Sequence, residues 1–480
     1  MYRILFAALL VLGLAKAAHA EEPIAFTAQS GESVEAFAGT IEVPEYRGDP
    51  AGRTISLAYV RFPSTSEDPG PPIVYLAGGP GGSGIGTARG RRFALFMAMR
   101  EHGDVIAFDQ RGTGDSTALP ECVSPVTVSD TERLTDESLA GYWRRAIAAC
   151  GDYWRGEGVD LRGYTTRESV ADLTDLRVHL GAGKISLWGI SYGSHLALAA
   201  LDAIPGEIDR VVLASAEGLD QTVKLPARTD AYFARLQEAV NTQPAARAAY
   251  PDIAGMMRRV HARLEAEPMM LTVPTAEGGS YRFLLQRPTI QQFASQLIAD
   301  PTSAPILLAL YASLDAGDAS LATMLISQFH QPGRPITLRP MPIAMDVASG
   351  ISAERHALFE SQVREGLLGG YLNFPMPQAA GIWPGFELDE DFRTGPEGDT
   401  PLLLLTGTLD GRTYPEGQRE AVAGLTNVTQ VTIRNAGHNL FMSDPAVHAA
   451  IRAFMRGEPI ERREIAIDLP DFMEIVPPGR

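Results

Sequence analysis

Short apolar runs alternate with helix-like segments over much of the chain. Segment 167–180 reads as a helix, and residues 194–203 are good helix formers. Apolar and β-branched stretches predict strands at residues 55–62, 72–76, 104–108, 184–188 and 208–215. Such alternation is typical of a mostly parallel sheet with helices on both faces. We therefore predict an α/β fold.

The alternation stops near residue 220 and resumes near residue 400. Between these points, segments 230–240, 253–265 and 289–298 carry apolar residues at helical spacing, without convincing strands. Strands are predicted again at 401–405 and 428–433, and a helix at 446–455. A chain of 480 residues is too long for one compact core, which favours a large insertion. The predicted parts are a signal peptide (1–20), the first part of the core (21–219), an inserted helical cap (220–399), the second part of the core (400–456) and a tail (457–480).

The first twenty residues have the features of a cleavable signal peptide. Arg3 gives a positive start, residues 4–14 are apolar, and residues 18–20 form an Ala-x-Ala cleavage site. The apolar run is short for a bilayer span, which favours cleavage over an uncleaved membrane anchor. No later stretch has the pattern of a transmembrane helix. We therefore expect an exported protein, periplasmic or secreted, without stable membrane insertion after cleavage.

The chain is acidic, with a net charge of −17 and a pI near 5.0. Such a chain is repelled by phosphate backbones and by anionic lipid, so we expect neither nucleic acid nor a membrane surface as a partner. The charge alone does not identify a substrate.

The chain has two cysteines, Cys122 and Cys150. An even pair in an exported protein predicts a disulfide, and the alternative is two free thiols. The bridge would close a loop of about 28 residues, which is worth roughly 3–4 kcal/mol on the loop-entropy model.

Residues 188–193, Trp-Gly-Ile-Ser-Tyr-Gly, contain a Gly-x-Ser-x-Gly motif between a predicted strand and a predicted helix. This is the context of a nucleophile elbow, in which the glycines allow a sharp turn that exposes the serine. The N-terminus of the following helix favours developing negative charge. The motif therefore predicts Ser191 as a nucleophile, against the alternative of a serine in a Gly-rich turn.

A nucleophilic serine needs a base, and the base needs an orienting acid. After a nucleophile elbow these residues follow in the order acid, then histidine. His438 lies in a Gly-containing loop after the last apolar strand and is the expected base, whereas His195 falls in the elbow helix and is expected to pack there. Asp410 follows a strand and a turn and is the expected acid. Glu217, just after strand 208–215, is its competitor.

Residues 77–84, Ala-Gly-Gly-Pro-Gly-Gly-Ser-Gly, follow a predicted strand. Their bare backbone can approach a substrate, and we expect the amides of Gly79 and Tyr192 to form an oxyanion hole. The stretch also matches a dinucleotide fingerprint, but Pro80 removes an amide, so no cofactor is expected. No Cys/His cluster predicts a metal. Residues 109–116, Asp-Gln-Arg-Gly-Thr-Gly-Asp-Ser, are expected to brace the neighbouring loop.

Together these motifs resemble the prolyl-aminopeptidase-like family of α/β-hydrolase serine peptidases, over about residues 55–455. The sequence Gly-Ile-Ser-Tyr-Gly-Ser is most similar to the secreted tripeptidyl-aminopeptidase-like branch. The resemblance implies an α/β-hydrolase fold, a helical cap over the site and removal of residues from peptide N-termini. The chain departs from the family at Ala77, where a histidine often precedes Gly-Gly-Pro-Gly, and at Met345 and Ala380, where cap cysteines are often found nearby.

The expected function is therefore an aminopeptidase that works through an acyl-enzyme, acting on a peptide or a small ester. Two alternatives stay open, which are a carboxylesterase with the same triad and a non-catalytic binding protein on a hydrolase scaffold. A reader of the cationic peptide amine should contain carboxylates. Glu217, at the entry to the insertion, and Asp346, within it, are the candidates.

Overall fold

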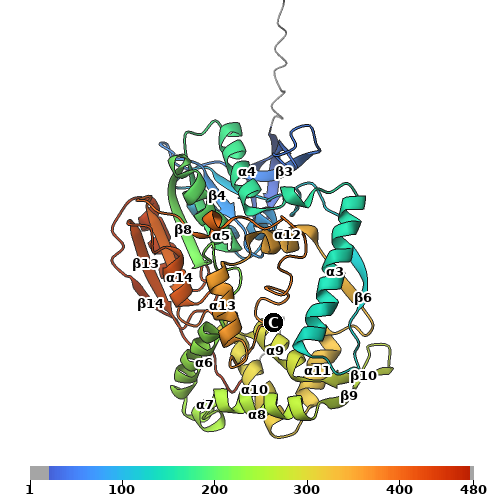
Figure 1. Cartoon of the computed structure of the whole chain (residues 1–480). Coiled ribbons are helices and arrows are strands. Elements are labelled where there is room, and N and C mark those ends of the chain that lie inside the picture. Colours follow the sequence, from blue (N-terminus) through green and yellow to red (C-terminus); the bar gives the residue numbers. More distant parts are fainter. Residues whose placement is uncertain (1–20, 476–480) are drawn as a thin grey trace, which may run out of the picture.

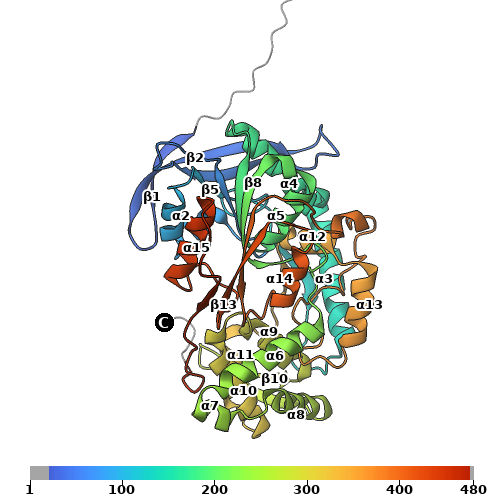
Figure 2. The same ribbon diagram turned by 90° about the vertical axis from the view of Figure 1, so that its left-hand side faces the viewer.

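A ten-stranded sheet forms the centre of the molecule, in the order β1-β2-β3-β5-β4-β7-β8-β12-β13-β14 (Figures 1 and 2). The computed structural model describes residues 21–475, and the predicted signal peptide lies outside them. Strands from β5 and β4 to β14 are parallel, whereas β1, β2, β3 and β5 pair antiparallel at one edge. The predicted mostly parallel sheet is thus confirmed. The strands are β1 (Glu22–Thr27), β2 (Ser33–Pro44), β3 (Thr54–Phe62), β4 (Ile73–Leu76), β5 (Val105–Phe108), β7 (Ile185–Ser191), β8 (Ile208–Ala216), β12 (Leu402–Gly407), β13 (Val428–Arg434) and β14 (Glu464–Ala466).

Helices cover both faces of this sheet (Figure 2). The central strands β4, β5, β7 and β12 are almost completely buried, which explains their nearly continuous apolar sequences. One apolar core lies under α1 (Gly84–Arg89), α2 (Phe93–Met99) and α15 (Pro445–Met455). The other lies under α4 (Thr166–His179), α5 (Tyr192–Ala203) and α14 (Pro415–Ala421).

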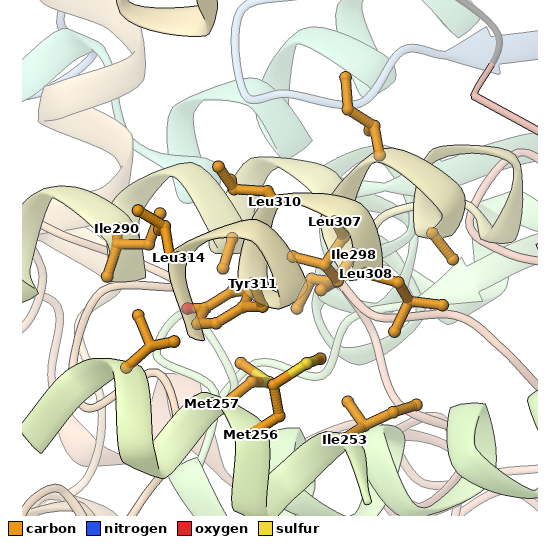
Figure 3. Close-up of a cluster of buried hydrophobic side chains, with 14 of the residues drawn as sticks. Ile253, Met256, Met257, Ile290, Ile298, Leu307, Leu308, Leu310, Tyr311 and Leu314 are labelled. Atoms are coloured by element: carbon orange, nitrogen blue, oxygen red, sulfur yellow. The ribbon is translucent and has the colours of Figure 1, made fainter. Parts of the chain in front are cut away.

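A second body, with its own apolar core, is inserted between β8 and β12 (Figure 1). Figure 3 shows part of that core, where Met256 and Met257 of one helix face Tyr311 of another. The hairpin of β9 and β10 within it was not expected from the pattern, which indicated a mostly helical segment. The elements are α6 (Pro226–Asn241), α7 (Pro244–Ala249), α8 (Ile253–Ala266), β9 (Met269–Pro274), β10 (Ser280–Leu285), α9 (Arg287–Leu297), α10 (Ala304–Asp315) and α11 (Ser320–Phe329).

The side wall of the cap combines two distant stretches of chain. Strand β6 (Cys122–Thr127) leaves the sheet region and pairs antiparallel with β11 (Pro335–Leu338) of the insertion. A disulfide joins Cys122 to Cys150 in the long helix α3 (Asp136–Gly156), as expected from the sequence. The helices α12 (Pro340–Ser349) and α13 (Ala353–Gln362) follow β11. Our division of the chain at 220–399 stays a proposal, to which residues 122–156 are now added as part of the cap.

The C-terminal tail connects the two bodies. Strand β14 extends the sheet beside β13, and Phe472 is buried in the core of the cap. Gln243 holds this segment, because its side chain donates to the Pro470 carbonyl and accepts from the Phe472 amide. The 3₁₀ helices span Leu161–Gly163, Pro205–Glu207, Pro301–Ser303 and Glu390–Arg393. Among residues 21–475, no helix combines the length and the apolar character needed to cross a bilayer.

The disulfide should stabilise the wall of the cap. Replacing Cys122 and Cys150 together by Ser should lower the free energy of unfolding by about 3–4 kcal/mol, because the unfolded chain regains a loop of some 28 residues. Urea unfolding of the oxidised protein and of the double variant measures the difference. Val123→Ser is the control, because Val123 is exposed in the same strand and its loss should change little. Equal stability of the variant and the oxidised protein would contradict this prediction.

Candidate active site

Ser191 occupies a strained turn between β7 and α5. Its backbone has φ 55° and ψ −128°, which a residue with a side chain rarely adopts. Glycine is required on both sides, because a Cβ at Gly193 would lie 2.0 Å from the Leu76 carbonyl oxygen and one at Gly189 would lie 2.6 Å from the Gly193 oxygen. The Ser191 side chain is partly exposed at the ends of the parallel strands. This is the geometry of a nucleophile elbow.

Asp410 follows β12 and is completely buried. The amides of Arg412 and Thr413 donate to one carboxylate oxygen at 2.8 and 2.9 Å, and the Thr413 hydroxyl donates to the other at 2.7 Å. Burial alone would raise the pKa of Asp410, but His438 and these amides hold it below its ordinary value. The carboxylate is therefore ionised at neutral pH and fixed in orientation.

His438 faces this carboxylate from the loop after β13. Its Nδ1 lies 3.1 Å from both oxygens of Asp410, so Nδ1 carries the proton and Nε2 is free to act as a base. The Ser215 hydroxyl, at the end of β8 beside Ser191, donates to the His438 carbonyl at 2.8 Å. The His438 amide donates to the Ala299 carbonyl at 2.9 Å. Two different elements thus fix the base.

The three residues of the predicted triad follow β7, β12 and β13, whose carboxyl ends lie at one edge of the sheet. Among the hydrogen bonds of residues 21–475, none joins the His438 ring to Ser191. Such contacts are often long without substrate and tighten in the substrate complex. The triad roles of Ser191, Asp410 and His438 stay a prediction that this arrangement favours.

The Gly-rich loop after β4 lies against the elbow. A Cβ at Gly78 would fall 3.1 Å from the Ser191 Cβ, and Gly79 has φ 128°, which favours glycine. Within residues 21–475, the Gly79 amide donates to no protein acceptor. The Tyr192 amide is in the first turn of α5, where amides have no acceptor in the helix. Among the described residues, neither expected oxyanion donor, the Gly79 amide or the Tyr192 amide, is hydrogen-bonded to a protein acceptor.

Residues 109–116 hold this loop in place, as expected. The buried Asp109 carboxylate accepts from the Ser83 hydroxyl at 2.7 Å and from the Ile85 amide at 3.1 Å. The Gln110 side chain donates to the Ala77 carbonyl at 3.1 Å. Arg111 is completely buried and pairs with Asp172 of α4, which anchors the motif to that helix. The motif thus supports the Gly-rich loop from behind through hydrogen bonds.

Glu217 and Asp346, the candidate amine readers, lie near Tyr192. Burial raises the pKa of the Tyr192 hydroxyl, and the charges of both carboxylates act in the same direction. Glu217 already pairs with Lys224 at 2.7 Å, an interaction with both side chains mostly buried. Burial and the charge of Glu217 raise the pKa of Asp346 to about 7, and Lys224 opposes this shift. Among residues 21–475, Asp346 forms no ion pair of its own, and it is only partly ionised at neutral pH.

Sequence reasoning missed several supporting residues. Lys224 had no motif that marks it as the partner of Glu217, and Thr413 had only its position three residues after Asp410. Ala299 joins the site solely through its carbonyl, which no sequence pattern reveals. His195 is buried between Tyr192 and the cap, where it contacts the Gly218 carbonyl and Ser349, and burial lowers its pKa. The expected packing role of His195 agrees with these contacts.

Two family models match parts of the chain. A family model for the alpha/beta hydrolase fold matches residues 71–292, and a model for TAP-like proteins matches residues 378–466. The chain has the α/β-hydrolase fold. The resemblance found in its motifs is thereby confirmed, and the chain has serine peptidase homologues.

Two proteins to which the chain is similar are peptidases by name. The chain is 31% identical over 187 residues to the serine protease Hip1 of Mycobacterium tuberculosis, covering 37% of this chain and 35% of Hip1. It is 31% identical over 193 residues to a tripeptidyl aminopeptidase of Streptomyces lividans, covering 37% and 34%. The match spans about a third of the length of each relative. A thermophilic esterase from Thermogutta terrifontis has a TM-score of 0.36 at 16% identity, covering 87% of this chain and 98% of the esterase.

Replacing Ser191 by Ala should abolish turnover while the protein stays folded. Loss of a triad nucleophile costs several orders of magnitude in rate, and at least about ten-thousandfold is expected here. Hydrolysis rates and circular dichroism give the two readouts. Ser361→Ala, at an exposed hydroxyl of α13, is the control that should keep full activity. A folded Ser191→Ala protein with normal turnover would refute the assignment.

The acid is tested by comparing Asp410→Asn with Glu217→Gln. The first should slow labelling of Ser191 by a fluorophosphonate by orders of magnitude, because an amide cannot hold His438 in the productive tautomer. The second should leave the labelling rate nearly intact, because Glu217 pairs with Lys224 and makes no contact with His438 among the described residues. His438→Ala should be as damaging as Asp410→Asn. A reversed order of the two carboxylate variants would make Glu217 the acid.

Proposed function

We propose that this α/β-hydrolase is a serine peptidase that cuts peptides near their free N-terminus through an acyl-enzyme on Ser191. The observation that carries the proposal is the buried, ionised Asp410 fixed on His438 Nδ1, together with a strained, partly exposed serine at the neighbouring strand end. The matches to peptidases support the substrate class, since two relatives that are peptidases by name are each 31% identical to the chain over 187 and 193 residues.

The proposed reaction follows from the positions of these groups. His438 Nε2 takes the proton of Ser191 Oγ as the oxygen attacks the peptide carbonyl carbon. The resulting oxyanion accepts hydrogen bonds from the Gly79 and Tyr192 amides, which have no competing partner. His438 then returns the proton to the leaving amine, and the C–N bond breaks. Water, activated by the same histidine, hydrolyses the acyl-enzyme and restores Ser191.

The restriction to N-termini is proposed to come from Asp346. A peptide α-amine has a pKa near 8 and is cationic at neutral pH. Glu217 is already balanced by Lys224, whereas Asp346, once ionised, supplies a negative charge near Tyr192 that no ion pair among the described residues neutralises. Its low solvation strengthens an ion pair with the amine, because charges interact more strongly in a poorly polar environment. Binding of the free amine at Asp346 would thus fix which peptide bond, counted from the N-terminus, reaches Ser191.

The Cys122–Cys150 disulfide supports export as a further part of the proposal. Disulfides persist in oxidising compartments such as the periplasm or the extracellular medium. We place the protein there, as the sequence predicted.

A substrate panel tests the peptidase proposal. Aminoacyl and tripeptidyl arylamides should be hydrolysed in preference to aryl esters of comparable size. Turnover of esters alone would make the protein a carboxylesterase. Failure to react with any substrate, or with a fluorophosphonate, would favour a binding protein on a hydrolase scaffold.

Asp346→Asn should raise KM for free-amine peptides at least about tenfold, because the amine loses its counter-charge. N-acetylated peptides and small esters should change little. In the parent protein Asp346 is protonated below pH about 7, so KM for free-amine peptides should rise as the pH falls from 7 to 5.5. Steady-state kinetics at several pH values should show that Asp346→Asn removes this rise.

Glu217→Gln is the matched control for this variant. Glu217→Gln should raise KM to the same extent for free-amine and for N-acetylated peptides, because the substitution leaves Lys224 largely buried without its partner. Equal effects of Asp346→Asn on blocked and free substrates would show that Asp346 only supports the fold.

A further inference from the structure

The cap contains a cavity of about 560 Å³ between α3, α9, β11 and the chain segment after α13. Aromatic side chains line it from two sides. Trp143, Tyr371 and Phe374 form one aromatic cluster, with ring centroids 5.5 to 5.7 Å apart along it, and Phe293 projects from α9. The Tyr371 hydroxyl donates to Asp136 at 2.7 Å, which fixes this wall to the start of α3. The cavity is therefore pre-formed and well suited to a flat apolar group.

Three of the segments that line the cavity also contact residues around the proposed reaction centre. Ser295 of α9 lines the cavity, and its carbonyl accepts a hydrogen bond from the side chain of Arg412, which lies two residues after Asp410. Four residues after Ser295, the Ala299 carbonyl accepts from the His438 amide. Ile336 of β11 also lines it, and β11 leads within about 10 Å to Arg339, next to the Gly-rich loop at Gly81.

The third segment reaches the loop between β8 and α6. Asn373, between the aromatic residues Tyr371 and Phe374, accepts a hydrogen bond from the Lys224 amide at 2.9 Å. In Figure 1 this segment descends between α12 and α9, with α3 beside it. The cavity thus lies over the edge of the sheet that carries the elbow.

The position of His438 indicates which part of a substrate enters the cavity. The general acid of a triad protonates the leaving amine, so the leaving group lies on the histidine side of the serine. Helix α9, which forms a wall of the cavity, is the element whose C-terminal continuation binds the His438 backbone. The acyl part then extends away from the histidine, and in the proposed function it extends towards Asp346, whose charge acts on the Tyr192 hydroxyl.

We propose that this cavity binds the leaving segment of the peptide, C-terminal to the bond that is cut, and selects an aromatic side chain in it. The inference rests on the proposed peptidase activity and extends it to the far side of the scissile bond. Burial of one aromatic ring removes enough apolar surface from water to change kcat/KM by at least about tenfold.

The test fills the cavity. Gln292 of α9 lines it, is half-buried and forms no side-chain hydrogen bond among the described residues, so Gln292→Trp places an indole in the cavity. Gln328→Trp makes the same substitution at an exposed position of α11 that does not line the cavity. Two peptide series are compared, one with the acyl part fixed and phenylalanine or glycine as the first leaving residue, the other with the leaving part fixed and the acyl part varied.

The parent protein should prefer the phenylalanine leaving residue, and Gln292→Trp should lower the phenylalanine-to-glycine ratio of kcat/KM at least about tenfold. Gln328→Trp should keep the parent ratio. Trp143→Ala should also lower the ratio, because it removes a ring from the aromatic wall. Retained fluorophosphonate labelling of Ser191 shows that each variant still folds around its site. An unchanged ratio in Gln292→Trp, or a loss that follows the acyl series instead, would overturn the proposal.

A failure of the peptidase proposal would show itself separately. If the parent protein hydrolyses esters but no peptides, benzyl and methyl esters of one acid replace the peptides. A benzyl-to-methyl ratio that Gln292→Trp lowers would then keep the leaving-group cavity without the peptidase. If Gln292→Trp leaves the benzyl-to-methyl ratio unchanged, both the peptidase activity and the leaving-group role of the cavity are wrong.

Discussion

The whole site depends on one close approach between two pieces of backbone. The turn after β7 comes so near the end of β4 that a Cβ at Gly193 would lie 2.0 Å from the Leu76 oxygen. The strained conformation of Ser191, which costs on the order of 1–3 kcal/mol, persists because the surrounding strands leave the turn no other path. Since β4 runs on directly into the Gly-rich loop, this contact also sets the distance from Ser191 to the Gly79 amide. A single packing constraint thus places the proposed nucleophile, Ser191, and the proposed oxyanion donor, Gly79, relative to each other.

Two carboxyl groups near this turn are driven in opposite directions by their surroundings. Asp410 accepts amide and hydroxyl donors and faces His438, so its pKa is lowered despite complete burial. Burial and the charge of Glu217 raise the pKa of Asp346 to about 7, although Lys224 opposes the shift. Pairs of titratable groups separated in this way commonly divide the roles of a site between them. In the proposed function, the ionised Asp410 would orient the base and the pH-sensitive Asp346 would bind the substrate amine.

The sequence predicted those parts of the site that follow from local rules. Ser191 ends β7, whereas Asp410 and His438 follow β12 and β13 in loops that contain glycine, and parallel strands bring their carboxyl ends to one edge. The antiparallel β1 and β2 were missed because they lie at the sheet edge, where apolar and polar residues mix. The pairing of β6 with β11 was missed because it joins residues some 200 positions apart, and Lys224 was missed because ion pairs leave no periodic trace. Long-range contacts of this kind need the folded chain.

The same long-range contacts determine what the cap can do. The cap is attached to the sheet at both ends of the insertion, before α6 and before β12. It is also attached through β6, which pairs with β11 and is joined to α3 by the disulfide, and through Phe472 of the tail. A body fixed at several separate places keeps its cavity in shape before a substrate arrives, so little ordering cost is left for binding. The aromatic wall on α3 is therefore held at a set distance from α9, and through α9 from His438. Selection of the leaving segment would then follow from the fixed geometry of the fold, in the same way as the position of Ser191 follows from Gly193.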